Sequence, residues 1–152
     1  MEKIEYNIEE RAISTFRGGL NCAQAVFSSF AEKLGYDKEL ALSVSAGFGG
    51  GMGRLQGTCG VVTGAFMVIG MYNSQKYTEN LDRKEHSYSM IQEFNSRFMT
   101  EHETTCCKDL INCDLSTAEG RTIAKEKELH ETICEVCMAT SIRLLNELLV
   151  VN

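Results

Sequence analysis

The chain has 152 residues with 15 Lys and Arg against 21 Asp and Glu, so its net charge is -6, and the basic residues are dispersed rather than gathered in a stripe. This distribution argues against a surface that follows a nucleic-acid backbone, and we expect no nucleic-acid partner. The longest apolar stretch, residues 60–72, contains three glycines and is shorter than the roughly 20 residues of a bilayer crossing, so we expect no membrane span.

The spacing of the apolar residues is helical, and the chain contains no proline that would force a helix to stop. The length is that of one domain, residues 1–152. We therefore expect an all-α, single-domain helical bundle of about five to seven helices, with a glycine-rich loop before a central buried helix.

The first helices are indicated by their apolar stripes and their caps. A first helix should end at the glycine pair Gly18–Gly19. Its stripe consists of Ile4, Ile8, Ala12 and Phe16. Asn21 caps a second helix that ends at Gly35, and a short third helix runs over about residues 37–45.

Residues 47–53 read Gly-Phe-Gly-Gly-Gly-Met-Gly, and we expect a loop there because glycine adopts backbone angles that other residues resist. Thr58 then supplies a capping hydroxyl for a helix over about residues 59–72, which is apolar on nearly every side and therefore central. Gly60 and Gly64, four residues apart, would let a neighbouring helix approach closely.

The second half of the chain predicts a long amphipathic helix over about residues 78–101. Its expected buried stripe is Leu81, Tyr88, Ile91, Phe94 and Phe98. A short turn of helix should start near Cys106, capped by Thr104 or Thr105, and residues 116–150 should form one or two further helices. The expected buried face of this last segment is Ile133, Val136, Cys137, Thr140, Leu144 and Leu148.

The seven cysteines are the main candidates for functional residues in the chain. Their odd number leaves at least one thiol free, metal-bound or shared between chains. The acidic start, Met1-Glu2-Lys3-Ile4-Glu5, lacks the basic head and apolar run of a secretion signal, so we expect a cytoplasmic protein with reduced thiols.

Three of the cysteines, Cys22, Cys59 and Cys107, lie where a helix is predicted to begin. Unpaired backbone N–H groups and the helix dipole stabilise a thiolate there, which favours redox or metal chemistry. The alternative is that Cys22 and Cys59 fill small niches of the core.

Other residues are weaker candidates. The loop glycines Gly49, Gly50, Gly51 and Gly53, with Arg54, form a candidate binding loop that leaves the Cys59 sulfur accessible and attracts an anion. Cys134 and Cys137 share a helical face and could chelate one metal with Cys22, Cys59 or Cys107. The three histidines, His86, His102 and His130, are expected at the surface.

Several segments together resemble the C_GCAxxG_C_C family of redox-active proteins. They are Asn21-Cys22-Ala23-Gln24-Ala25-Val26, the glycine loop, Cys59-Gly60-Val61-Val62-Thr63-Gly64, Cys107-Lys108-Asp109-Leu110, and a late cysteine before an amphipathic helix. The resemblance implies that Cys22, Cys59, Cys107 and Cys134 are the four family cysteines. Cys106, Cys113 and Cys137 are then additional. The chain departs from the family pattern at Val61, where alanine is expected, and at Glu135, where proline often follows the last cysteine.

The resemblance leads us to expect that the four cysteines meet in space and either exchange disulfides or ligate an iron–sulfur cluster or zinc. In the first case the chain is a thiol–disulfide oxidoreductase or electron-transfer protein, with Cys59 as nucleophile, Cys22 as resolving thiol and an unidentified redox partner. In the second, all four are metal ligands. The competing hypothesis is a noncatalytic helical interaction protein whose cysteines and glycines pack in a homodimer interface.

Overall fold

The computed structural model describes residues 7–149, and this part of the chain is helical apart from turns, loops and one isolated β-bridge between Thr58 and Cys106. The expected all-α class is thereby confirmed. The elements are α1 (Ile8–Arg17), α2 (Cys22–Lys33), α3 (Lys38–Ser45), α4 (Gly49–Met52), α5 (Gly60–Lys76), α6 (Asn80–His102), α7 (Cys107–Ile111), α8 (Ala118–Glu126), the π-helical η1 (His130–Cys134) and α9 (Glu135–Leu148). None of the helices within the described residues is both long and apolar enough to cross a membrane.

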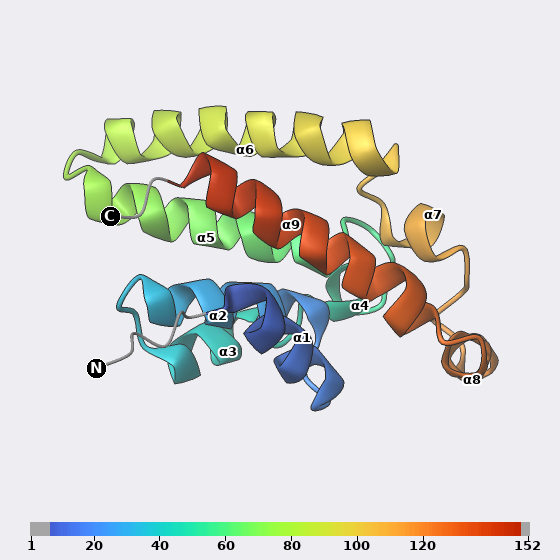
Figure 1. Ribbon diagram of the computed structural model, residues 1–152. Coiled ribbons are helices and arrows are strands. Elements are labelled where there is room, and N and C mark those ends of the chain that lie inside the picture. The colour runs from blue at the N-terminus through green and yellow to red at the C-terminus, as the bar shows by residue number, and fades with distance from the viewer. Residues whose placement is uncertain (1–6, 150–152) are drawn as a thin grey trace.

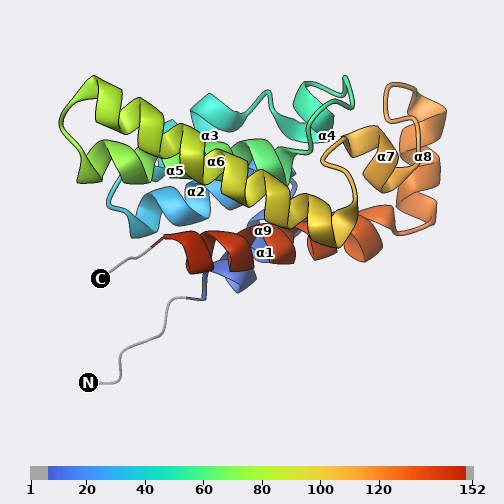
Figure 2. The ribbon, with the colours of Figure 1, turned by 90° about the horizontal axis from the view of Figure 1, so that it is seen from above.

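The helices form layers around α5 (Figure 1). The long helix α6 covers α5 and α9, and α1, α2 and α3 lie on the opposite side. The short elements α4, α7 and α8 gather at one end of the molecule, where η1 leads into α9 (Figure 2). The starts of α2 and α5 both lie toward this end, so residues far apart in the sequence meet there.

The helix α5 is central, as expected from its composition. Its buried residues are Gly60, Val61, Val62, Gly64, Ala65, Val68, Ile69, Tyr72 and Asn73. A methyl group on Gly60 would overlap the Cys22 sulfur, and one on Gly64 would lie 3.0 Å from the Ala23 carbonyl oxygen. The expectation that these two glycines admit a neighbouring helix is therefore confirmed, and that neighbour is α2.

The N-termini of α2 and α5 are capped in different ways. Asn21 and Gln24 form a reciprocal capping box at α2, which confirms the predicted cap. At α5 the N-cap is Cys59, not Thr58, and no side chain caps the helix. Thr58 instead forms the β-bridge to Cys106, because the extended strand-like backbone before α5 pairs with residues 105–107.

The glycine-rich segment is more ordered than the loop expected from its composition. Five consecutive residues have a positive φ of 63–69°, so the chain forms a left-handed turn. They are Gly50, Gly51, Met52, Gly53 and Arg54. Residues with a side chain avoid such runs, and the three glycines make this one accessible.

The buried stripe predicted for α6 is only partly right. Phe94 and Phe98 are fully buried, but Leu81 and Tyr88 are 65% and 54% exposed. Tyr88 precedes Phe94 by six residues, which places it about 120° away around the helix. On α9, Val136 is likewise exposed, whereas Cys137, Thr140 and Leu144 are buried.

The last segment forms two helices, α8 and η1–α9, separated at Glu128, which has a φ of 53°. Thr117 caps α8 by accepting a hydrogen bond from the Gly120 N–H. The predicted positions Ile4 and Val150 lie outside the described residues.

Candidate functional site

A cavity of about 630 Å³ opens at the end of the molecule where α1, α2, α4, α7, α8 and η1 meet. Its wall includes Cys22, Cys59, Cys107 and Cys134, the four cysteines singled out by the family resemblance. We call it the cysteine cavity. All seven cysteines are free thiols, and the additional ones, Cys106, Cys113 and Cys137, do not line this cavity.

Cys22 and Cys59 form a hydrogen-bonded pair within this wall. Cys22 is the first residue of α2, and Cys59 is the N-cap of α5. The two helix starts can approach this closely because Gly60 has no side chain at the point where α5 meets the Cys22 sulfur.

The pKa of Cys22 is lowered from 9.0 to about 7. The largest cause is the hydrogen bond from Cys59, and the backbone N–H groups of Gly50, Ala23 and Cys22 itself add to it against the opposing effect of burial. A thiol with a pKa near 7 is about half ionised at neutral pH. Cys22 therefore presents a thiolate to the cavity.

Cys59 has the opposite shift. Its pKa is raised well above the usual value because its thiol donates to Cys22, because it is buried, and because the Cys22 charge repels a second anion. The backbone N–H of Val61 favours its ionised form but is outweighed by these three causes. A thiolate at Cys59, expected from its position at a helix start, is therefore not favoured, and the pair holds one proton that resides on Cys59.

The other two cysteines of the wall stay protonated near neutral pH. Burial and then repulsion from Cys22 raise the pKa of Cys107 to about 11. The same two causes raise the pKa of Cys134, which lies inside the continuous helix η1–α9 rather than at a helix start. Its sulfur is 3.7 Å from His130 Nδ1.

The glycine segment lies at the cavity, where the sequence placed it. Gly49, Gly50, Gly53 and Arg54 line the wall, and the Gly50 N–H bonds to the Cys22 sulfur. Gly51 is buried behind the wall, where a methyl group would lie 2.7 Å from Cys107 Cβ. The left-handed turn thus brings a backbone donor to one cysteine and packs against another.

Sequence reasoning missed several charged residues of the wall. Arg17 donates to the buried Glu135 carboxylate through Nη2 at 2.7 Å and Nε at 3.1 Å. Arg121, Glu131 and His130 also line the cavity. They come from α1, α8, η1 and α9, and no local motif joins them, so only the approach of these helices identifies the set.

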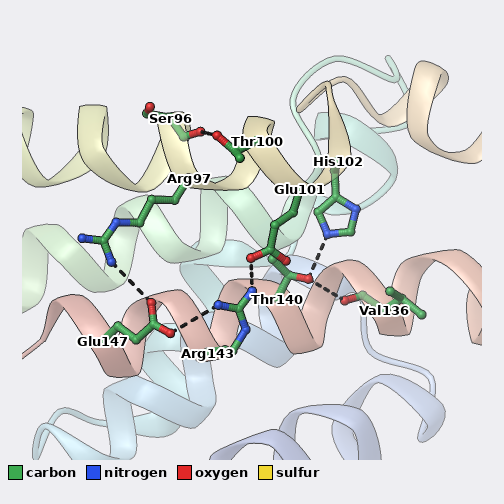
Figure 3. A network of polar contacts seen from close by, with 9 residues as sticks. All are labelled: Ser96, Arg97, Thr100, Glu101, His102, Val136, Thr140, Arg143 and Glu147. Carbon is green, nitrogen blue, oxygen red and sulfur yellow. Dashed lines mark hydrogen bonds and ion pairs between the residues drawn. The ribbon is translucent and has the colours of Figure 1, made fainter.

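Two of the histidines expected at the surface are partly buried. His130 packs edge-on against Phe16, with ring centroids 5.8 Å apart. His102 Nε2 lies 2.8 Å from Thr140 Oγ1, which donates to the Val136 carbonyl, in the contact between α6 and α9 (Figure 3). Since that hydroxyl has only one proton, Nε2 is the donor to Thr140.

Cys137 lies behind the cavity rather than on its wall. It is 2% exposed, and its sulfur is 3.9 Å from His102 Nδ1. Burial, and next the Cys22 charge, raise the pKa of Cys137 to about 11.

The donor geometry does not fit a preformed metal centre. Within residues 7–149, no three or more His, Cys, Asp or Glu side chains are grouped so that they could hold one metal ion. Four-thiolate zinc and iron–sulfur sites require such a group. The reaction proposed below therefore uses the thiol groups alone.

A comparison with protein families matches residues 20–148 to the family described as "Putative redox-active protein (C_GCAxxG_C_C)". The matched stretch contains all seven cysteines and the whole glycine segment. No curated protein and no solved structure matches the chain significantly.

Proposed function

Since this chain belongs to the C_GCAxxG_C_C family of redox-active proteins, we propose that it acts by thiol–disulfide exchange through Cys22 and Cys59. The observation that carries the proposal is the hydrogen-bonded pair in which Cys22 has a pKa of about 7 and Cys59 keeps the proton. This is the arrangement of an attacking thiolate beside a resolving thiol.

In the proposed reaction, the Cys22 thiolate attacks one sulfur of a substrate disulfide, forms a mixed disulfide and releases the first substrate thiolate. The Cys59 proton passes to that thiolate, and the Cys59 sulfur then attacks Cys22 Sγ and releases the second. The substrate disulfide gains two electrons and becomes one thiol and one thiolate. The two cysteines lose two electrons and form a disulfide.

These roles reverse the assignment expected from the sequence, in which Cys59 attacks and Cys22 resolves. Three backbone N–H groups and one thiol donor favour the Cys22 anion, whereas Cys59 is 8% exposed and its burial and its contact with Cys22 outweigh the backbone N–H of Val61. Cys107 and Cys134 share the wall but remain protonated, so Cys22 is the thiol that makes the first attack on the substrate.

We place this chemistry in a reducing cytoplasm, where a second thiol compound returns the Cys22–Cys59 disulfide to the dithiol form. That reductant is the redox partner of the protein. The competing hypothesis, packed cysteines without chemistry, requires a Cys22 thiol of ordinary reactivity.

The test is to oxidise the reduced protein with 2-hydroxyethyl disulfide and to map the product by mass spectrometry. We expect a Cys22–Cys59 disulfide, a trapped mixed disulfide at Cys22 in Cys59→Ser, and little reaction in Cys22→Ser. Cys106→Ser is the matched control, because a serine hydroxyl can also donate to the Gln56 carbonyl that Cys106 contacts. A first adduct on any cysteine other than Cys22, or none at all, would contradict the proposal.

A further inference from the structure

We propose that the cysteine cavity selects small disulfides that carry carboxylates, and that Arg54 and Arg121 bind those carboxylates. This inference rests on the proposed exchange at Cys22 and adds the class of substrate.

The first support is the charge of the wall. The protein carries a net charge of -6, yet the cavity contains three arginines and two glutamates. Arg17 and Glu135 neutralise each other through their paired hydrogen bonds. Two guanidinium groups, Arg54 and Arg121, remain against the Glu131 carboxylate and the Cys22 thiolate, so the wall is close to neutral in a protein that is acidic overall. The cavity is therefore less negative than the protein as a whole, and its two arginines are available to attract an anion to the thiolate.

Arg54 lines the same cavity as the reactive sulfur and packs against the residue that bonds to it. A methyl group on Gly50 would lie 3.0 Å from Arg54 Cγ, so the aliphatic part of Arg54 packs over the residue whose N–H bonds to Cys22. The side chain is exposed and forms no hydrogen bond or ion pair with the described part of the protein. A left-handed φ of 63° at this position holds it at the turn. A guanidinium group there is free to bind a carboxylate next to the thiolate.

Arg121 is oriented by its own contact with the backbone. Its Nη1 donates to the Leu115 carbonyl at 2.9 Å, and the side chain is half-buried in the wall. A guanidinium group has five N–H donors, so this bond leaves the others for a ligand. A held, planar donor set suits a carboxylate better than a mobile ammonium group.

The size of the cavity favours a small molecule over a protein disulfide. A volume of about 630 Å³ is in the range of small-molecule sites. Cys22 is half-buried and Cys59 nearly fully buried, so the substrate sulfur has to enter the cavity to reach them. A small disulfide that carries carboxylates satisfies both the space and the charge.

The kinetic test compares two alkylating agents of similar size, anionic iodoacetate and neutral iodoacetamide, at Cys22. We expect the ratio of the two rates to exceed that of free cysteine at the same pH, and to fall about three- to tenfold in Arg54→Gln and in Arg121→Gln. The ratio should also fall at high salt. Lys125→Gln also removes one positive charge, at an exposed position of α8 that does not line the cavity, and should leave the ratio unchanged. Arg121→Lys keeps the positive charge, so its ratio should lie between those of the unmodified protein and Arg121→Gln.

The same preference should hold for disulfides. Glutathione disulfide, which is anionic, should oxidise the pair faster than 2-hydroxyethyl disulfide or the cationic cystamine. Equal rates for the three, a ratio equal to that of free cysteine, or faster oxidation by a protein disulfide would overturn the inference. Slow reaction of Cys22 with iodoacetamide as well would instead contradict the proposed function.

A binding measurement separates the inference from the thiol chemistry altogether. Titration calorimetry of Cys22→Ser with S-methylglutathione, which has no reactive disulfide, should show binding that Arg54→Gln weakens about tenfold. Circular dichroism of each variant checks that the fold is kept. Absence of binding to folded Cys22→Ser would overturn the inference whatever the reactivity of Cys22.

Discussion

At the scale of single residues, the chemistry depends on which sulfur carries the negative charge. The Cys22 thiolate is held by the Cys59 thiol and by the N–H groups of Gly50, Ala23 and Cys22. These donors come from three separate segments of the chain. The charge is therefore a product of the fold rather than of the helix start alone.

The lowered pKa of Cys22 predicts how its rate of alkylation depends on pH. The pKa of Cys22 is lowered from 9.0 to about 7, and only the thiolate reacts, so alkylation of Cys22 by iodoacetamide should rise as the pH passes 7 and level off above it. Cys59→Ala removes the largest stabilising contact and should move the midpoint to higher pH, with a rate at pH 7 several-fold lower. Rates measured by mass spectrometry from pH 5 to 10 test both statements.

The control for this profile is again Cys106→Ser, which should keep the midpoint of the unmodified protein. A midpoint near 9 in the unmodified protein, or one that Cys59→Ala leaves in place, would show that the Cys59 thiol does not stabilise the anion.

At the scale of elements, the close contact of α2 with α5 brings Cys22 to Cys59. A methyl group on Gly60 would overlap the Cys22 sulfur and one on Gly64 would press on the Ala23 carbonyl oxygen of α2, whereas one on Gly70, in the same helix, would meet nothing within 4 Å. The three positions therefore separate the cost of a clash from the intrinsic helix preference of alanine.

We expect Gly64→Ala to lower the free energy of unfolding by about 1–3 kcal/mol through overpacking, and Gly60→Ala to do so and also to disturb Cys22. Gly70→Ala should raise it by up to about 1 kcal/mol, because alanine is the better helix former. Urea unfolding of the three variants provides the comparison. Equal effects at Gly64 and Gly70 would contradict the close approach of α2.

At the scale of the whole molecule, α6 and α9 are joined both by apolar side chains and by exposed ion pairs. Arg143 pairs with Glu101 and Glu147, and Arg97 also pairs with Glu147 (Figure 3). All four of these side chains are at least 40% exposed. Phe98, on the buried side of α6, is fully buried.

Exposed ion pairs contribute little and are screened by salt, whereas burial of an aromatic side chain does not depend on ionic strength. Phe98→Ala should therefore lower the free energy of unfolding by about 3–5 kcal/mol at any salt concentration. Arg143→Gln should cause a much smaller loss that disappears at 1 M salt. Denaturant unfolding at low and high salt measures both, and a large loss in Arg143→Gln that persists at high salt would contradict this ranking.

The helical elements could be predicted because their signals are local. The cap at Asn21, the start of the third helix near Asp37 and the end of the second helix at Gly35 are confirmed, and each depends on residues within one or two turns. The predictions were wrong where contacts between segments distant in the sequence determine the structure. Thr58 leaves its predicted capping role to pair with Cys106, and Tyr88 stays exposed because α5 and α9 cover only the face of α6 that carries Phe94 and Phe98.

The sequence by itself determined the all-α class, the cysteines at three helix starts and the glycines where α2 meets α5, because periodicity, caps and missing side chains act between near neighbours. The motifs also identified the four cysteines that line one cavity. Only the tertiary structure decided that Cys22 rather than Cys59 favours the anion, and that Arg121 and His130 share its cavity. A thiol pKa depends on every donor and charge within a few ångströms, and here those groups come from helices that meet only after folding.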